Sequence, residues 1–369
     1  MLAGDAIPNS NIIQSNIIEK IAISLVNVER TNRGTAPLKN LSDLRSEDSD
    51  MFLSMAEAAF KVMQANKSKQ QDPFMENVQT IDLEVNSGIK INGSAFVTKQ
   101  FNVYPELKQQ LHAFFKISNE SDVLLVSLPG AHPAGLTQSP QEYKLPYRIP
   151  GMRLAMELKQ FNHLVFSDPG HFIGGLAASF FIGGSTFNMF DNIVKFVDLI
   201  VEYYGFPHDK VIFMGGSAGG FAAFQASTYS TKYNKAFILN QQVSIHDYVP
   251  LNKYDYFSKY FNLSNSKESL SHSPFADRFC CINRAEKIDI TNKSYYFLCN
   301  FNDPHYSKNI LLQEKIQHKC RNFVFDKYNG PQTHAAPDYE FFREKVISAV
   351  GILNNKYDHS ANKPIVRGE

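Results

Sequence analysis

The sequence lacks several features that would place it in a large class of proteins at once. Its 369 residues include only four cysteines, and none of them belongs to a CxxC pair or to a His/Cys spacing typical of zinc sites. Because the adjacent Cys280 and Cys281 cannot easily bridge to each other, we expect a reduced, cytoplasmic protein rather than a disulfide scaffold. We predict no metal site.

Strong charge and long apolar runs are also missing. The formal net charge is +1, so no global field favours nucleic acid or an anionic membrane surface. No window reaches the roughly 18 apolar residues of a membrane span, and the N-terminus has no basic start followed by an apolar run. There is no phosphate loop or dinucleotide fingerprint either. We therefore predict no nucleic-acid partner, no transmembrane segment and no permanently bound cofactor.

The most informative segment is a serine between glycines that follows an apolar run. Residues 211–214 read as a buried strand, and Gly215-Gly216-Ser217-Ala218-Gly219 has the GxSxG spacing of a nucleophile elbow. A serine on such a sharp turn has a strained backbone, so the positions two before and two after it must be nearly free of side chain. A turn that only packs tightly or binds phosphate has the same pattern. The strand before Ser217 and the helix after it favour catalysis.

The first 75 residues differ from the rest of the chain in the spacing of their apolar residues. Ile13, Ile17, Ile21 and Leu25 fall at helical intervals, and residues 51–60 form a second predicted helix that Ser49 could cap. We interpret residues 1–75 as a helical appendage.

After the appendage, the spacing of apolar residues changes from helical intervals to every second residue. From residue 78 apolar side chains alternate with polar ones, which predicts a short antiparallel meander through residues 101–103. Predicted strands then alternate with predicted helices. The strands are expected at 122–127, 163–166, 211–214, 235–239, 295–299 and 322–325, and the helices at 152–158, 189–204, 221–227, 309–318 and 339–353.

This alternation predicts the fold. Strands separated by helices give a mostly parallel sheet with helices on both faces. With the serine elbow in the middle, the pattern resembles the α/β-hydrolase fold. We expect an α/β-hydrolase domain over residues 76–354, a cap-like insertion at 245–293 and a loose C-terminal tail at 355–369.

The order of residues along the chain suggests partners for the serine. In this superfamily the acid and then the histidine follow the nucleophile, in loops after later strands. Asp303 follows the strand at 295–299 and His334 follows the strand at 322–325, so we predict Ser217, Asp303 and His334 as a catalytic triad. Asp247 is the alternative acid, because some members take theirs from that earlier loop. An isolated loop histidine is otherwise most simply a solvated side chain.

The oxyanion hole needs two backbone N–H donors. The first is expected from Ala218, after the nucleophile, and the second from Gly130 or Ala131 in the loop after an early strand. Four further side chains are possible substrate contacts: His132, His171, Tyr248 and His305. The tyrosines of the insertion suit sugar rings, but they could equally pack the insertion internally.

Three runs suggest a closer relationship: Gly215 to Ala223, Phe237 to Val243 with Asp247-Tyr248, and Asn302-Asp-Pro-His-Tyr306. Together they resemble α/β-hydrolase-fold O-acetyltransferases of bacterial capsule synthesis and, more distantly, an accessory secretion protein of glycosylated adhesins. The resemblance implies that Ser217 takes an acetyl group from acetyl-CoA and passes it to a sugar hydroxyl of a surface polysaccharide.

The residues themselves leave the acceptor open. Water would make the protein an esterase, whereas a sugar hydroxyl would make it a transferase. A non-catalytic scaffold or accessory protein in polysaccharide or glycoprotein export is the alternative from another class. A peptidase is weaker, because no feature of the sequence would recognise a peptide.

Overall fold

The computed structural model describes residues 19, 22–23, 79–83, 93–101, 110–131, 149, 151–169, 178–247, 256–355 and 366–367. The chain divides into two compact units, Met1–Asn77 and Val78–Glu369. In the first unit only Glu19, Ala22 and Ile23 are described, and all three are helical. These three residues fall within the first predicted helix, the rest of which lies outside the described residues. The second predicted helix and its N-cap lie outside them entirely, and the appendage stays a prediction.

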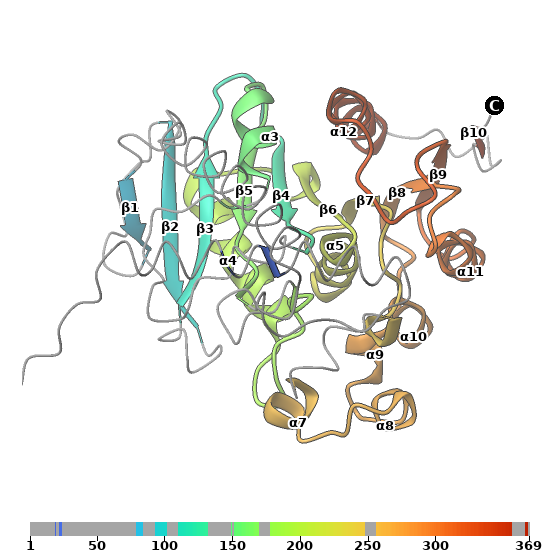
Figure 1. Ribbon diagram of the computed structural model, residues 1–369. Helices are drawn as coiled ribbons and strands as arrows, with labels where there is room; N and C mark the ends of the chain where they lie inside the picture. Colours follow the sequence, from blue (N-terminus) through green and yellow to red (C-terminus); the bar gives the residue numbers. More distant parts are fainter. Residues whose placement is uncertain are drawn as a thin grey trace, which may run out of the picture. The chain divides into compact units, whose positions relative to one another are not determined.

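The second unit is built on one sheet of ten strands in the order β1-β2-β3-β5-β4-β6-β7-β8-β9-β10 (Figure 1). The first five strands are β1 (Gln79–Asp82), β2 (Ser94–Gln100), β3 (Gln110–Lys116), β4 (Leu124–Leu128) and β5 (Asn162–Phe166). The others are β6 (Val211–Gly216), β7 (Lys235–Leu239), β8 (Ser294–Asn300), β9 (Asn322–Tyr328) and β10 (Val366–Arg367).

Most of these strands run parallel, as predicted. Strands β4 to β9 form one parallel set, and β3 is antiparallel to both of its neighbours, β2 and β5. The predicted antiparallel meander is wrong at its start, because β1 pairs with β2 in parallel, with Ile81 opposite Val97. The alternating pattern showed that one face is buried, but it carries no information on strand direction.

Strand β10 lies in the predicted loose tail. It pairs in parallel with β9, with Val366 opposite Phe325, and so joins residues 366–367 to the sheet edge.

Helices cover both faces of the sheet (Figure 1). Helices α3 (Met152–Glu157) and α12 (Tyr339–Asn354) lie on one face, and α4 (Met189–Tyr204), α5 (Ala218–Tyr229) and α11 (Tyr306–Ile316) lie on the other. Short 3-10 helices are η5 (His208–Lys210) and η6 (Ile245–Asp247). Among the described helices, none combines the length and the apolar composition needed to cross a bilayer.

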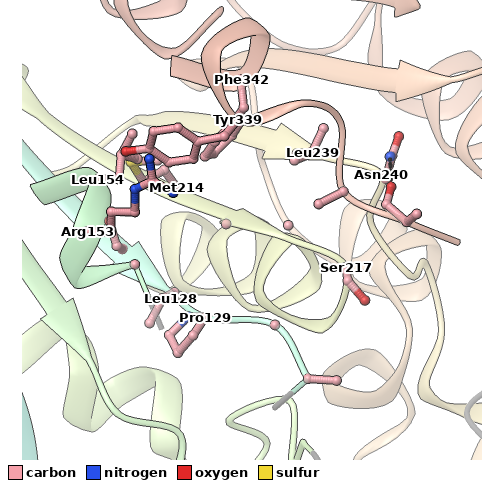
Figure 2. A pocket seen from close by; sticks show the side chains of 18 of the residues that line it. Leu128, Pro129, Arg153, Leu154, Met214, Ser217, Leu239, Asn240, Tyr339 and Phe342 are labelled. Atoms are coloured by element: carbon pink, nitrogen blue, oxygen red, sulfur yellow. Dashed lines mark hydrogen bonds between the residues drawn. The ribbon is translucent and has the colours of Figure 1, made fainter. Parts of the chain in front are cut away.

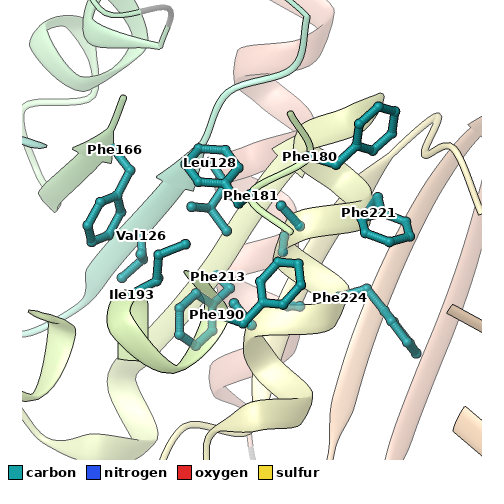
Figure 3. Close-up of a cluster of buried hydrophobic side chains, with 14 of the residues drawn as sticks. Val126, Leu128, Phe166, Phe180, Phe181, Phe190, Ile193, Phe213, Phe221 and Phe224 are labelled. Atoms are coloured by element: carbon teal, nitrogen blue, oxygen red, sulfur yellow. The ribbon is translucent and has the colours of Figure 1, made fainter. Parts of the chain in front are cut away.

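Each face has its own apolar core. On the α4/α5 side, aromatic rings from four segments interlock. Phe180, in the loop before α4, packs edge-on to Phe221 of α5 with ring centroids 5.5 Å apart (Figure 3). Phe166 of β5 packs similarly on Phe196 of α4. Helix α5 is buried on nearly all sides. Its alanines and glycines let it pack close against the sheet. The opposite core is smaller and is closed by α3 and α12.

The insertion at 245–293 forms short helices α7 (Tyr256–Phe261), α8 (Lys267–Ser271), α9 (Ala276–Phe279) and α10 (Cys281–Lys287). The Arg284 guanidinium donates to Asp277, 2.9 Å away, and to the Thr228 hydroxyl of α5, 3.0 Å away. Tyr256 donates its hydroxyl to the carbonyl of Gly183 at 2.7 Å. The described part of the insertion is therefore anchored to the α4/α5 side of the sheet.

Candidate active site

The nucleophile elbow has the strained geometry that its glycines predict. Ser217 lies between β6 and α5 with φ 56° and ψ −125°, a conformation that non-glycine residues rarely adopt. A Cβ on Gly215 would lie 2.2 Å from the carbonyl oxygen of Gly219, and one on Gly219 would lie 2.0 Å from that of Leu128. Only glycine fits at either position, because the turn packs against its own backbone and against the end of β4.

The three predicted triad residues form one hydrogen-bonded line. The distance from Ser217 Oγ to His334 Nε2 is 2.7 Å, and from His334 Nδ1 to Asp303 Oδ2 it is 2.8 Å. The Asp303 side chain is 3% exposed and that of His334 is 25% exposed. Asp303 also accepts the backbone N–H of His305 through Oδ1 at 2.7 Å, which fixes the carboxylate. An imidazole held between a carboxylate and a hydroxyl can act as a general base toward that hydroxyl.

Of the two candidate acids, the structure brings Asp303 to the histidine. Asp303 follows β8, and the parallel strands β8 and β9 end at the same sheet edge as β6, so their loops converge on Ser217. Asp247 closes η6 after β7. No described hydrogen bond joins Asp247 to His334.

Two predicted oxyanion donors lie beside the serine. Ala218 is the first residue of α5, so its N–H has no intrahelical acceptor, and the positive end of the helix dipole points to the same place. Gly130 packs against the elbow, because a Cβ there would lie 2.8 Å from the Gly216 carbonyl oxygen and 3.4 Å from Ser217 Cβ. Ala131 lines the same cavity as Ser217.

The predicted substrate contacts are only partly described. His132, His171 and Tyr248 lie outside the described residues. His305 is at the N-terminus of α11, with its ring edge-on to that of His334 and 4.8 Å between centroids. The ligand atoms of Asp303, His305 and His334 lie within 4.8 Å of one another, close enough to bind a metal ion. Two of these residues are already held by the hydrogen bonds of the serine line, so the triad accounts for their arrangement.

Two asparagines, Asn300 and Asn302, hold the loop that carries His334, which we call the histidine loop. Neither was predicted as a site residue. Asn300, the last residue of β8, donates to the carbonyl of Pro331 at 2.7 Å and accepts from the N–H of Gly330 at 2.9 Å. Asn302 donates to the carbonyl of Gly330 at 2.9 Å. The only available signal was their position directly after a strand of the parallel sheet.

A cavity of about 490 Å³ opens beside Ser217, within the usual size range of small-molecule sites. From the serine it extends along the end of β6 toward α3 and α12, where Leu154, Met214 and Phe342 lie (Figure 2). No described residue of the 245–293 insertion lines it. The described tyrosines of the insertion make other contacts: Tyr256 and Tyr260 pack on each other, with ring centroids 5.0 Å apart, and the Tyr256 hydroxyl bonds the Gly183 carbonyl.

Comparisons with known proteins bear on the fold. No protein-family model matches the chain, and no curated protein does. Among solved structures, a capsule O-acetyltransferase of Neisseria meningitidis serogroup A, a histidine-to-alanine mutant in complex with CoA, matches with a TM-score of 0.51 and 13% identity. The match covers 72% of this chain and 98% of that one.

Two further solved structures match a similar share of the chain. Acylaminoacyl peptidase of Pyrococcus horikoshii has a TM-score of 0.50 and 12% identity, covering 73% of this chain and 43% of that chain. Puromycin hydrolase has a TM-score of 0.47 and 14% identity, covering 66% of this chain. This chain spans only 37% of that puromycin hydrolase chain. Together the strand order, the serine elbow and the two matches with TM-scores of 0.51 and 0.50 show an α/β-hydrolase fold.

Proposed function

We propose that this protein catalyses serine-dependent acyl transfer through a covalent acyl-enzyme. The observation that carries the proposal is the hydrogen-bonded line from Ser217 through His334 to Asp303, at an elbow whose Gly215 and Gly219 leave no room for a side chain. A buried carboxylate, an imidazole and a strained serine in this order are the parts that nucleophilic acyl transfer needs.

The chemistry follows from the atoms in that line. Ser217 Oγ attacks the carbonyl carbon of an ester or thioester while its proton moves to His334 Nε2. The carbonyl oxygen becomes an oxyanion, which the N–H groups of Ala218 and of Gly130 or Ala131 can stabilise. His334 then gives the proton to the leaving alcohol or thiol, and the acyl group stays on Ser217. Asp303 keeps the imidazole in the tautomer that accepts at Nε2 and stabilises the imidazolium.

The second half of the reaction sets the type of enzyme. An acceptor hydroxyl loses its proton to His334 and attacks the acyl carbon. The bond from that carbon to Ser217 Oγ breaks, and Oγ takes the proton back from His334. Water as the acceptor gives hydrolysis, and a sugar hydroxyl gives an O-acyl sugar. The resemblance to capsule O-acetyltransferases makes a surface polysaccharide the first acceptor to test. The structural neighbour in complex with CoA makes acetyl-CoA the first donor. A cytoplasmic location is part of the proposal, in keeping with four free cysteines.

The test is the intact mass of wild type and of Ser217→Ala after incubation with acetyl-CoA and, separately, with a fluorophosphonate. We expect the fluorophosphonate to add one adduct to the wild type and none to the variant. An acetyl adduct from acetyl-CoA that also requires Ser217 would identify acetyl transfer. If neither reagent gives a Ser217-dependent adduct, the proposal fails, and a non-catalytic accessory role becomes the better account.

A further inference from the structure

The cavity beside Ser217 changes character along its length. At the serine end it is bounded by polar groups of the proposed machinery, including His334 and Asn240. Away from the serine its walls are apolar: Leu128, Leu154, Met214, Leu239 and Phe342, which we call the acyl slot (Figure 2). The slot lies between the carboxyl end of the sheet and helices α3 and α12.

The walls of the slot come from well-packed elements. Met214 and Leu239 are 3% and 5% exposed and belong, with Leu154, to the core on the α3/α12 face. The floor near the serine is backbone only, because Gly215 and Gly216 carry no side chain into it. A Cβ on Gly216 would lie 3.3 Å from Leu239 Cδ2, so a larger residue there would crowd the passage from Ser217 into the slot.

The far end of the slot carries no uncompensated charge. Arg153 donates from Nε to Glu157 at 2.8 Å, and its guanidinium stacks over the ring of Tyr339, 3.9 Å from the centroid. Arg153 is the one charged side chain among the described residues that line the cavity, apart from the histidine of the triad. A phosphate or carboxylate that approached Arg153 would have to compete with Glu157. The slot therefore favours an uncharged, apolar occupant.

We propose that the acyl slot binds the hydrocarbon chain of the acyl group, and that the group carried by Ser217 is longer than acetyl. This inference rests on the proposed acyl-enzyme. A methyl group is close in size to a water molecule, which occupies about 30 Å³ in the liquid. Acetyl would thus leave most of the 490 Å³ cavity unfilled, whereas a chain of several carbons would contact its walls.

The groups around Ser217 are placed so that the acyl chain of a substrate would point into the acyl slot. The carbonyl oxygen has to face the N–H groups of Ala218 and the Gly130 loop, and the leaving group has to face His334 Nε2, which protonates it. The acyl chain is the remaining substituent of the carbonyl carbon, and the slot is the apolar space that adjoins Ser217.

The experiment measures kcat/KM on p-nitrophenyl esters from acetate to decanoate. For the wild type we expect a rise of about fourfold per added methylene until the slot is full, and a fall beyond that length. Leu154→Phe should move the best substrate to a shorter chain, because a larger side chain occupies the slot. Phe342→Ala should move it to a longer chain. Phe341→Ala is the matched control, since Phe341 is also partly buried against the same core but does not line the cavity.

The outcomes separate this inference from the proposed function. Circular dichroism and thermal unfolding establish that each variant is folded. If the wild type prefers acetate, or if Leu154→Phe and Phe342→Ala leave the preferred length where it was, the acyl slot is overturned even though the fluorophosphonate labels Ser217. If Ser217 is not labelled and no ester of any length is turned over, it is the acyl-enzyme itself that fails.

Discussion

The side-chain carbonyl of Asn240 accepts a hydrogen bond from the backbone N–H of Asn300, with 2.6 Å between the two atoms. Asn240 follows β7 in a left-handed conformation, with φ 39°, and its side-chain amide also donates to the carbonyl of Ala335 at 3.2 Å. One asparagine thus joins the end of β8, which leads to the predicted acid, to the loop that carries the predicted base. The spacing between Asp303 and His334 depends on such contacts between loops, not on either loop alone.

Removing the side chain of Asn300 should lower activity by loosening the histidine loop. Asn300→Ala loses the bonds to Pro331 and Gly330, and we expect kcat and the rate of fluorophosphonate labelling to fall about 10- to 100-fold. The free energy of unfolding should fall by about 1–3 kcal/mol. Stopped-flow labelling and urea unfolding measure the two effects.

Asn162→Ala is the matched control for this prediction. Asn162 is also fully buried and makes three side-chain hydrogen bonds, to Ser118, Ser121 and Val123, at the opposite end of the sheet. It should cost similar stability and leave the labelling rate of the folded protein unchanged. Equal loss of labelling in both variants would show that the effect of Asn300 is not local.

The identity of the acid can be tested by amide substitution. Asp303→Asn keeps the size of the side chain but favours the wrong imidazole tautomer, so kcat should fall by about 10⁴-fold while the protein stays folded. Asp247→Asn should leave kcat within a few-fold of wild type. Steady-state kinetics on a reactive ester measures both. The reverse ranking would transfer the role to Asp247.

A methyl group on Gly130 should disturb the oxyanion hole without unfolding the protein. Its Cβ would lie 2.8 Å from the Gly216 carbonyl oxygen, so the loop after β4 must shift away from the serine. We expect Gly130→Ala to lower kcat about 10²- to 10³-fold, the loss typical of one missing donor. A variant with wild-type kcat would exclude this loop as the second donor.

Gly351→Ala is a glycine substitution that should stabilise the protein and, unlike Gly130→Ala, leave its activity unchanged. It lies within α12, and a methyl group added there would have no described atom within 4 Å outside its own stretch of helix. Since alanine is the better helix former, we expect the free energy of unfolding to rise by up to about 1 kcal/mol, with kcat unchanged. Chemical denaturation measures the gain, and a loss of stability would contradict it.

Buried histidines should make the fold sensitive to acid. His163 in β5 is fully buried, and burial lowers its pKa from 6.5 to about 3. Between about pH 3 and 6.5, His163 therefore binds a proton in the unfolded chain but not in the folded chain. The contribution of His163 to stability is complete above pH about 6.5 and is lost progressively as the pH falls toward 3, with a limiting slope of about 1.4 kcal/mol per pH unit.

A variant isolates that contribution. His163→Gln cannot be protonated, so its free energy of unfolding should fall less steeply than that of wild type between pH 6.5 and 4. Urea denaturation at several pH values measures these slopes, and parallel curves for wild type and His163→Gln would refute the assignment.

Much of the fold could be predicted from local pattern. The helix at 189–204 and the strand at 235–239 have the predicted bounds, because strong periodicity and a closing Gly205 mark their ends. The sequence did not reveal β3, although it has apolar Leu111, Ala113 and Phe115 at alternate positions. Nor could it give the parallel direction of β1, which depends on the partner strand.

For the site, the sequence by itself determined the serine elbow, because the steric demand for glycine on both sides of Ser217 is local and leaves a pattern of five residues. Chain order then predicted the loops that carry Asp303 and His334. Only the tertiary structure showed that Asp303, rather than Asp247, hydrogen-bonds His334, that Asn240 and Asn300 hold the histidine loop, and that the cavity lies against α3 and α12. Those contacts join residues up to 117 positions apart. Their partners are fixed by the packing of parallel strands and not by neighbours in sequence.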